Sequence, residues 1–118
     1  MSRNRSSAKA AGTRAETAVA RYLATALNDD RIERRAKTGA RDRGDISGVR
    51  IHGQRVVIEV KDVARMALAE WVTEAETEAG NDDALAGVVW HKRRGTTDPG
   101  EWYVTCTGAA FVALIGGQ

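Results

Sequence analysis

The segment VVIEVKD at residues 56–62 has the composition of a buried strand, yet it contains an acidic and a basic residue two positions apart. Val and Ile favour extended backbone, and alternate residues of a strand point to the same face. We therefore expect Val57, Glu59 and Lys61 to share one face, while the intervening aliphatic residues point into the core. A charged pair on one face of an apolar strand needs a partner or water, because burying an unpaired charge is costly. The segment predicts a core strand that also carries a charged site.

Length and composition are typical of a single globular domain. The chain has 118 residues, of which 42% are hydrophobic and 29% are charged. It contains no apolar run of the ~20 residues that a membrane span needs, and its N-terminus lacks the apolar centre of a secretory signal. One cysteine excludes an internal disulfide, and two isolated histidines do not indicate a zinc site. These features predict a cytoplasmic protein with no membrane partner.

The charge of the chain is unevenly distributed. Residues 1–65 contain 15 Lys and Arg against 8 Asp and Glu, whereas residues 66–118 contain 3 against 8. A basic half on a nearly neutral protein favours a polyanionic partner that meets one face. The alternative is a charged surface that contacts only solvent.

Turn and periodicity signals divide the chain into helices and strands. Residues 1–12 are typical of a flexible basic tail, and residues 13–118 are expected to form one domain. The predicted elements are a helix at 13–27, strands at 31–36, 45–51 and 55–61, a helix at 64–80, strands within 84–93 and at 101–106, and a short terminal helix or apolar tail at 107–117. This order predicts an α/β fold with a mixed central sheet flanked by helices.

The stretch just before VVIEVKD supplies a second carboxylate. Asp45 follows Gly44, and pairing of the two hairpin strands would bring Asp45 near Glu59. Two converging carboxylates favour a hard divalent cation such as Mg²⁺, for which Mn²⁺ can substitute. Lys61 on the same face is suited to orient an attacking water or to offset charge on a phosphate. The alternative is an exposed strand with a cross-strand ion pair.

Glu16 adds a third acid on the apolar side of the first predicted helix, in line with Val19 and Leu23. One interpretation is that it reaches the metal site from that helix. The other is that Glu16 forms a capping box with Thr13, which also fixes the predicted start of the helix. The two interpretations are compatible.

Two stretches carry a family resemblance. RGDISGV at 43–49, followed by VVIEVKD, resembles the signature of the PD-(D/E)xK nuclease superfamily. RAETAVARYL at 14–23 resembles the helix that supplies an extra Glu in the branch of archaeal and phage-type Holliday junction resolvases. With the later helix and strands, the resemblance covers residues 13–115. The sequence departs from the signature at Gly44, which stands where the superfamily has Pro.

The resemblance implies a restriction-endonuclease-like fold and a Mg²⁺-dependent endodeoxyribonuclease. It implies that Asp45, Glu59 and Lys61 hydrolyse phosphodiester bonds, with Glu16 as a further ligand of the metal or of water. The resolvase branch implies a homodimer that binds branched DNA during recombination, in the cytoplasm of a bacterium or of a phage-infected cell. The sequence leaves two rivals: a restriction-like, repair or flap nuclease with the same site, and a non-catalytic nucleic-acid-binding module.

Basic residues flank Asp45 in sequence, and we predict that they contact the DNA backbone. The candidates are Arg34, Arg35, Lys37, Arg41 and Arg43. The acids of the 64–80 helix, by contrast, are predicted to form its solvated face; these are Glu70, Glu74, Glu76 and Glu78. Trp71 on that helix is expected in the core or in a dimer contact rather than as a platform for base stacking. That helix or the terminal apolar segment is the candidate dimer interface.

Overall fold

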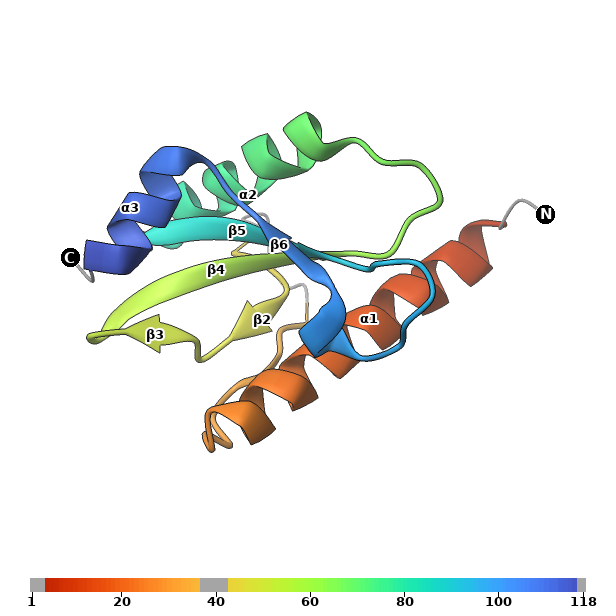
Figure 1. Cartoon of the computed structure of the whole chain (residues 1–118), viewed down its shortest axis with the longest axis horizontal. Helices are drawn as coiled ribbons and strands as arrows, with labels where there is room; N and C mark the ends of the chain where they lie inside the picture. Colours follow the sequence, from red (N-terminus) through yellow and green to blue (C-terminus); the bar gives the residue numbers. More distant parts are fainter. Residues whose placement is uncertain (1–3, 37–42, 117–118) are drawn as a thin grey trace.

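Strand β4 (Gln54–Lys61), which contains all of VVIEVKD except Asp62, lies at the centre of the molecule (Figure 1). The computed structural model describes residues 4–36 and 43–116. The remaining elements are α1 (Arg5–Ala26), β1 (Glu33–Arg34), β2 (Ile46–Ser47), β3 (Arg50–Ile51), α2 (Leu68–Asn81), β5 (Ala86–His91), η1 (Pro99–Glu101), β6 (Tyr103–Thr105) and α3 (Gly108–Gly116). The predicted order of helices and strands is confirmed, except that the single strand expected at 45–51 is two strands, β2 and β3.

The main sheet has the order β3-β4-β5-β6, with β4 and β5 parallel and the two outer pairs antiparallel. Helices α1 and α2 lie on opposite sides of it (Figure 1). The fold is thus a compact α/β arrangement with a mixed sheet flanked by helices, as expected. Within the described residues, no helix combines the length and the apolar content that crossing a bilayer requires.

The two faces of β4 meet different helices. Ile58 and Val60 belong to the larger core cluster, which α1 covers with Ala15 and Val19. The opposite face of β4 lies toward α2. Glu59 on this face pairs in register with Val89 of β5, and Val89 packs against Trp71 and Ala75 of α2. The predicted alternation along the strand is confirmed. The face that carries Glu59 and Lys61 is covered by α2, so the charged pair does not lie on an open surface.

Helix α1 begins eight residues earlier than predicted. Its N-cap is Asn4, whose side-chain oxygen accepts a hydrogen bond from the backbone N–H of Ser7 at 2.8 Å. Thr13 lies inside the helix, so the predicted capping box with Glu16 is wrong. Residues 5–12 are helical because a capping Asn precedes a run rich in Ala, Arg and Lys, all strong helix formers.

The predicted strand 45–51 is divided into two short strands. β2 pairs with β1, and β3 pairs with β4. Gly48, with φ of 90°, separates them. The backbone of this segment still follows the edge of β4, since the N–H of Asp45 donates to the carbonyl of Ile58 and the N–H of Val56 donates to that of Val49.

Close packing of α2 on β5 depends on Gly87, where a Cβ atom would collide with the backbone carbonyl of Ala75. Gly87→Ala should lower the free energy of unfolding by about 1–3 kcal/mol, the usual cost of overpacking a core. Gly80→Ala is the matched control, because a Cβ at Gly80 meets nothing within 4 Å and alanine favours helix. Urea unfolding measures both variants. Equal stability of the two would show that the helix moves away at no cost.

Candidate functional site

Asp45 is held against β4, further along the edge that pairs with β3, by its own backbone and side chain. Its N–H donates to the carbonyl of Ile58 at 2.9 Å, and its Oδ2 accepts from the N–H of Val60 at 2.8 Å. Gly44 permits this approach, because it has φ of 93° and a Cβ there would lie 2.8 Å from Cγ1 of Val57. The two bonds flank Glu59, so the sequence prediction that Asp45 meets Glu59 is confirmed.

Glu59 is a deeply buried carboxyl group, with 4% of its surface exposed. Burial raises its pKa far above the ordinary value of 4.5, and the carboxyls of Asp45 and Glu78, within hydrogen-bonding reach, raise it further. Ionised carboxylates only accept hydrogen bonds, and Oε2 of Glu59 has no hydrogen-bond partner among the described residues. The group therefore needs either a proton or a cation beside it.

Helix α2 contributes two further acids to this place. One carboxylate oxygen each from Glu59, Glu74 and Glu78 lies within 4.8 Å of the others. Carboxylate oxygens so close together are the donor set that hard divalent cations prefer. The structure thus contains a group of acids larger than the Asp45–Glu59 pair that the sequence predicts.

The prediction of a solvated acidic face on α2 is wrong for Glu74 and Glu78, although Glu70 and Glu76 are exposed as expected. Glu78 is 2% exposed and Glu74 is half-buried. Their spacing contains the missed signal, because Glu74 and Glu78 follow Trp71 by three and seven residues and so lie on the buried stripe of the helix.

Lys61 lies at the end of β4 on the same face as Glu59. Its Nζ is 3.2 Å and 3.1 Å from the two carboxylate oxygens of Glu74. Burial alone would lower the pKa of Lys61, but the acids around it, with Glu74 also in a hydrogen bond to Nζ, outweigh burial and raise the pKa above its ordinary value. Lys61 is therefore a firmly protonated ammonium group beside the acids.

Glu16 is not part of the group formed by Glu59, Glu74 and Glu78. Its Oε1 accepts a hydrogen bond from Nε of Arg34 at 2.8 Å. Helix α1 packs on the face of β4 opposite to Glu59, which explains the separation. The role of Glu16 as a metal ligand stays a prediction.

Three of the predicted DNA-binding residues are described, whereas Lys37 and Arg41 lie outside the described residues. Arg34 pairs with Glu16. Arg35 and Arg43 each lie 3.9 Å from Asp82, a buried acid just after α2. The side chain of Arg55 also binds Asp82: its Nε donates to Oδ2 of Asp82 at 3.2 Å, and its Nη2 donates to the backbone carbonyl of Asp82 at 2.6 Å. Among the described residues, three guanidinium groups thus lie around Asp82. Sequence reasoning missed both Arg55 and Asp82 because their partners are remote in the chain.

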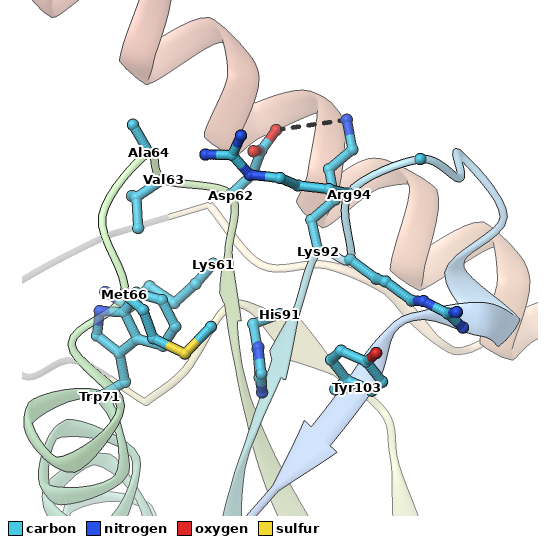
Figure 2. A pocket seen from close by; sticks show the side chains of 12 residues that line it. Lys61, Asp62, Val63, Ala64, Met66, Trp71, His91, Lys92, Arg94 and Tyr103 are labelled. Carbon is cyan, nitrogen blue, oxygen red and sulfur yellow. Dashed lines mark ion pairs between the residues drawn. The ribbon is translucent and has the colours of Figure 1, made fainter.

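A pocket of about 850 Å³ opens at the C-terminal ends of β4 and β5 (Figure 2). It is lined by Lys61, Asp62, Val63, Ala64, Met66, Trp71, His91, Lys92, Arg93, Arg94, Gly95 and Tyr103. Figure 2 shows Trp71 and Met66 on one side, Tyr103 on the other, and His91 between them. His91 is buried, its Nε2 lies 2.8 Å from Oγ1 of Thr105, and burial lowers its pKa.

A comparison of the chain with protein-family models, with curated proteins and with solved structures found no significant match.

Proposed function

We propose that the protein is a metal-dependent DNA endonuclease of the PD-(D/E)xK type, with a restriction-endonuclease-like fold, and that its substrate is a four-way DNA junction. The observation that carries the proposal is the fixed position of Asp45 against Glu59 on β4, with Lys61 on the same face. This arrangement repeats the order and the spacing of the resemblance noted in the sequence. The chemistry of the site, rather than the fold, supports the assignment.

The donor atoms fit a Mg²⁺ or Mn²⁺ ion. Within the part of the chain that the structure describes, Glu59 has a buried oxygen without a hydrogen-bond partner, and the acids around it offer carboxylate oxygens as metal ligands. Asp45 and Glu59 would hold the ion, with Glu78 next to them, whereas Glu16 lies apart from these acids in this structure. A cation there would also offset the repulsion among the buried carboxylates.

When bound to these acids, Mg²⁺ would supply Lewis acidity toward water and toward the scissile phosphate. The ammonium group of Lys61 offsets negative charge that develops on the phosphate as the water oxygen attacks phosphorus and a P–O ester bond breaks. Its raised pKa keeps Lys61 charged for this role. Glu74 holds the Nζ atom in position between the acids and the neighbouring pocket.

The substrate and the dimer are supported by two surfaces. The arginines around Asp82 form a basic patch that is suited to the phosphate backbone. Helix α3 exposes Phe111, Val112 and Ile115, and such an apolar surface is suited to a contact between two copies. A C2 dimer would present two sites to the two symmetric strands of a junction.

Cleavage assays on labelled four-way junction, linear duplex and single strand, each with Mg²⁺ or EDTA, test the proposal. Paired, Mg²⁺-dependent nicks in the junction alone are the expected result. Equal cutting of linear duplex would contradict the proposed specificity for junctions but would still support the proposed active site. Binding without cutting in any metal would make the protein a nucleic-acid-binding module and overturn the enzymatic proposal.

Arg43→Ala should weaken binding of junction and duplex alike, because Arg43 is exposed and lies beside Asp45 in sequence. Losing one phosphate contact should lower the slope of log affinity against log salt by about 1. Arg31→Ala is the control, since Arg31 is an exposed arginine already paired with Asp29. Fluorescence anisotropy at several salt concentrations measures the slope. An unchanged slope in Arg43→Ala would remove this residue from the DNA interface.

A further inference from the structure

We propose that the pocket at the C-terminal ends of β4 and β5 binds one unpaired nucleotide of a DNA strand, with its base on the aromatic wall and its phosphate at the basic rim. The inference rests on the proposed function, since it names the form of DNA that the site takes. It predicts a preference for DNA that carries single-stranded nucleotides next to a duplex.

The aromatic wall is a row of three rings from three elements. The ring centroids of Trp71 and His91 are 5.7 Å apart, and those of His91 and Tyr103 are 5.8 Å apart. Trp71 and His91 are buried, whereas Tyr103 is 51% exposed. The guanidinium carbon of Arg93 lies 5.6 Å from the centroid of the Tyr103 ring. Bases stack on both aromatic rings and guanidinium planes, so this wall suits any base.

The rim of the pocket favours an anion. Its charged lining residues are four cations, Lys61, Lys92, Arg93 and Arg94, and one acid, Asp62. Asp62 lies 3.9 Å from Lys92, as the dashed line in Figure 2 marks. The pocket therefore combines an apolar aromatic interior with a positive edge, which matches a nucleotide rather than a neutral apolar ligand.

The pocket is connected to the candidate metal centre through Lys61, which lines the pocket and binds Glu74. A nucleotide in the pocket would direct the adjoining phosphate of its strand toward the acids of β4 and α2. A base inside a duplex cannot occupy the pocket, because its faces are covered by the neighbouring base pairs and it must leave the stack first. The volume of about 850 Å³ is within the usual range of ligand pockets, roughly 300–1,000 Å³.

The test compares binding of a blunt duplex and of the same duplex with a single-stranded tail, in EDTA so that no strand is cut. The wild-type protein should bind the tailed duplex more tightly. Tyr103→Ala should weaken binding of the tailed duplex by roughly 5- to 100-fold, which is the range for the loss of one base–aromatic stack. Its affinity for the blunt duplex should stay unchanged. Tyr103→Phe keeps the ring and should bind as the wild type does.

A second variant does not depend on the aromatic wall. Arg94→Ala removes an exposed cation of the rim and should weaken binding of the tailed duplex more than that of the blunt duplex. Arg50→Ala is the charge control, since Arg50 lies on β3, which pairs with β4 at the end opposite to Lys61. Free thymidine monophosphate is added as a competitor. If a low concentration of thymidine monophosphate displaced the tailed duplex, the pocket would be a site for free nucleotides. That result would overturn the proposal that it binds a nucleotide of a DNA strand.

Equal affinity for tailed and blunt duplex in the wild type, or unchanged binding in both Tyr103→Ala and Arg94→Ala, would also overturn the pocket proposal. Because these measurements need no cleavage, they separate the two proposals. If the protein prefers tailed DNA but cuts no DNA, the pocket proposal stands and the enzymatic proposal falls. A protein that cuts junctions with unaltered pocket variants keeps the enzymatic function and loses the pocket.

Discussion

Replacing Glu59 with glutamine should reduce DNA cleavage by at least about 10²–10³-fold, which is more than the loss of a residue that only orients a metal ligand. Glutamine has almost the same shape as glutamate, but its amide is neutral and carries a donor in place of one ligand oxygen. Glu59 is buried beside Asp45 and Glu78, so the change falls directly on the acids that are proposed to hold the metal. Single-turnover cleavage of a junction in Mg²⁺ measures the effect.

The control for this prediction is Glu76→Gln, the same chemical change at an exposed position of α2. It should cut at the wild-type rate. Glu59→Gln should also bind the junction in EDTA as tightly as the wild type, and its metal-free form should be at least as stable at neutral pH. Those two measurements separate a lost reaction from a lost fold. A Glu59→Gln protein that cuts normally would end the assignment of the site.

The strand and its charged face could be predicted because strand geometry has a period of two and depends only on neighbouring residues. The same local logic placed Asp45 near Glu59, since a hairpin of short connection brings its two strands together. The details differ, because Gly48 divides the outer strand and Asp45 binds β4 partly through its carboxylate.

The burial of the acids of α2 could have been predicted only by giving their position on the apolar stripe of the helix more weight than their charge. Glu78 lies on the stripe marked by Trp71 and Ala75, yet glutamate is almost never fully buried unless it has a partner. Its burial follows from the tertiary packing of α2 over Glu59, which no local pattern contains. The arginines around Asp82 have the same origin, as Arg55 and Asp82 are 27 residues apart.

The site also brings opposite charges together in a defined order. The acids lie where α2 covers β4, the arginines lie around Asp82 just beyond the end of α2, and the cations of the pocket lie past Lys61. A DNA strand that contacts both basic regions would run across the acids. Lys61 belongs both to the acidic group, through its ion pair with Glu74, and to the pocket lining.

Adding Mg²⁺ should stabilise the protein increasingly as the pH rises. Glu59 keeps its proton in the folded metal-free protein, whereas in the unfolded chain it loses the proton above the ordinary pKa of 4.5. The folded state then binds more protons, so its stability falls with rising pH, by up to about 1.4 kcal/mol per pH unit for one group. A divalent cation takes the place of the proton and removes this cost.

The measurement is urea unfolding in EDTA and in Mg²⁺ between about pH 7 and about pH 9. The window avoids His91, whose lowered pKa makes it contribute a change of opposite sign only below its ordinary 6.5. It also avoids Lys61, whose raised pKa affects stability only above 10.5. At Mg²⁺ 100-fold above its dissociation constant, binding adds about 2.7 kcal/mol. Glu59→Gln should lose both the slope in EDTA and the response to Mg²⁺, and the same slope with and without Mg²⁺ in the wild type would contradict a metal site among these acids.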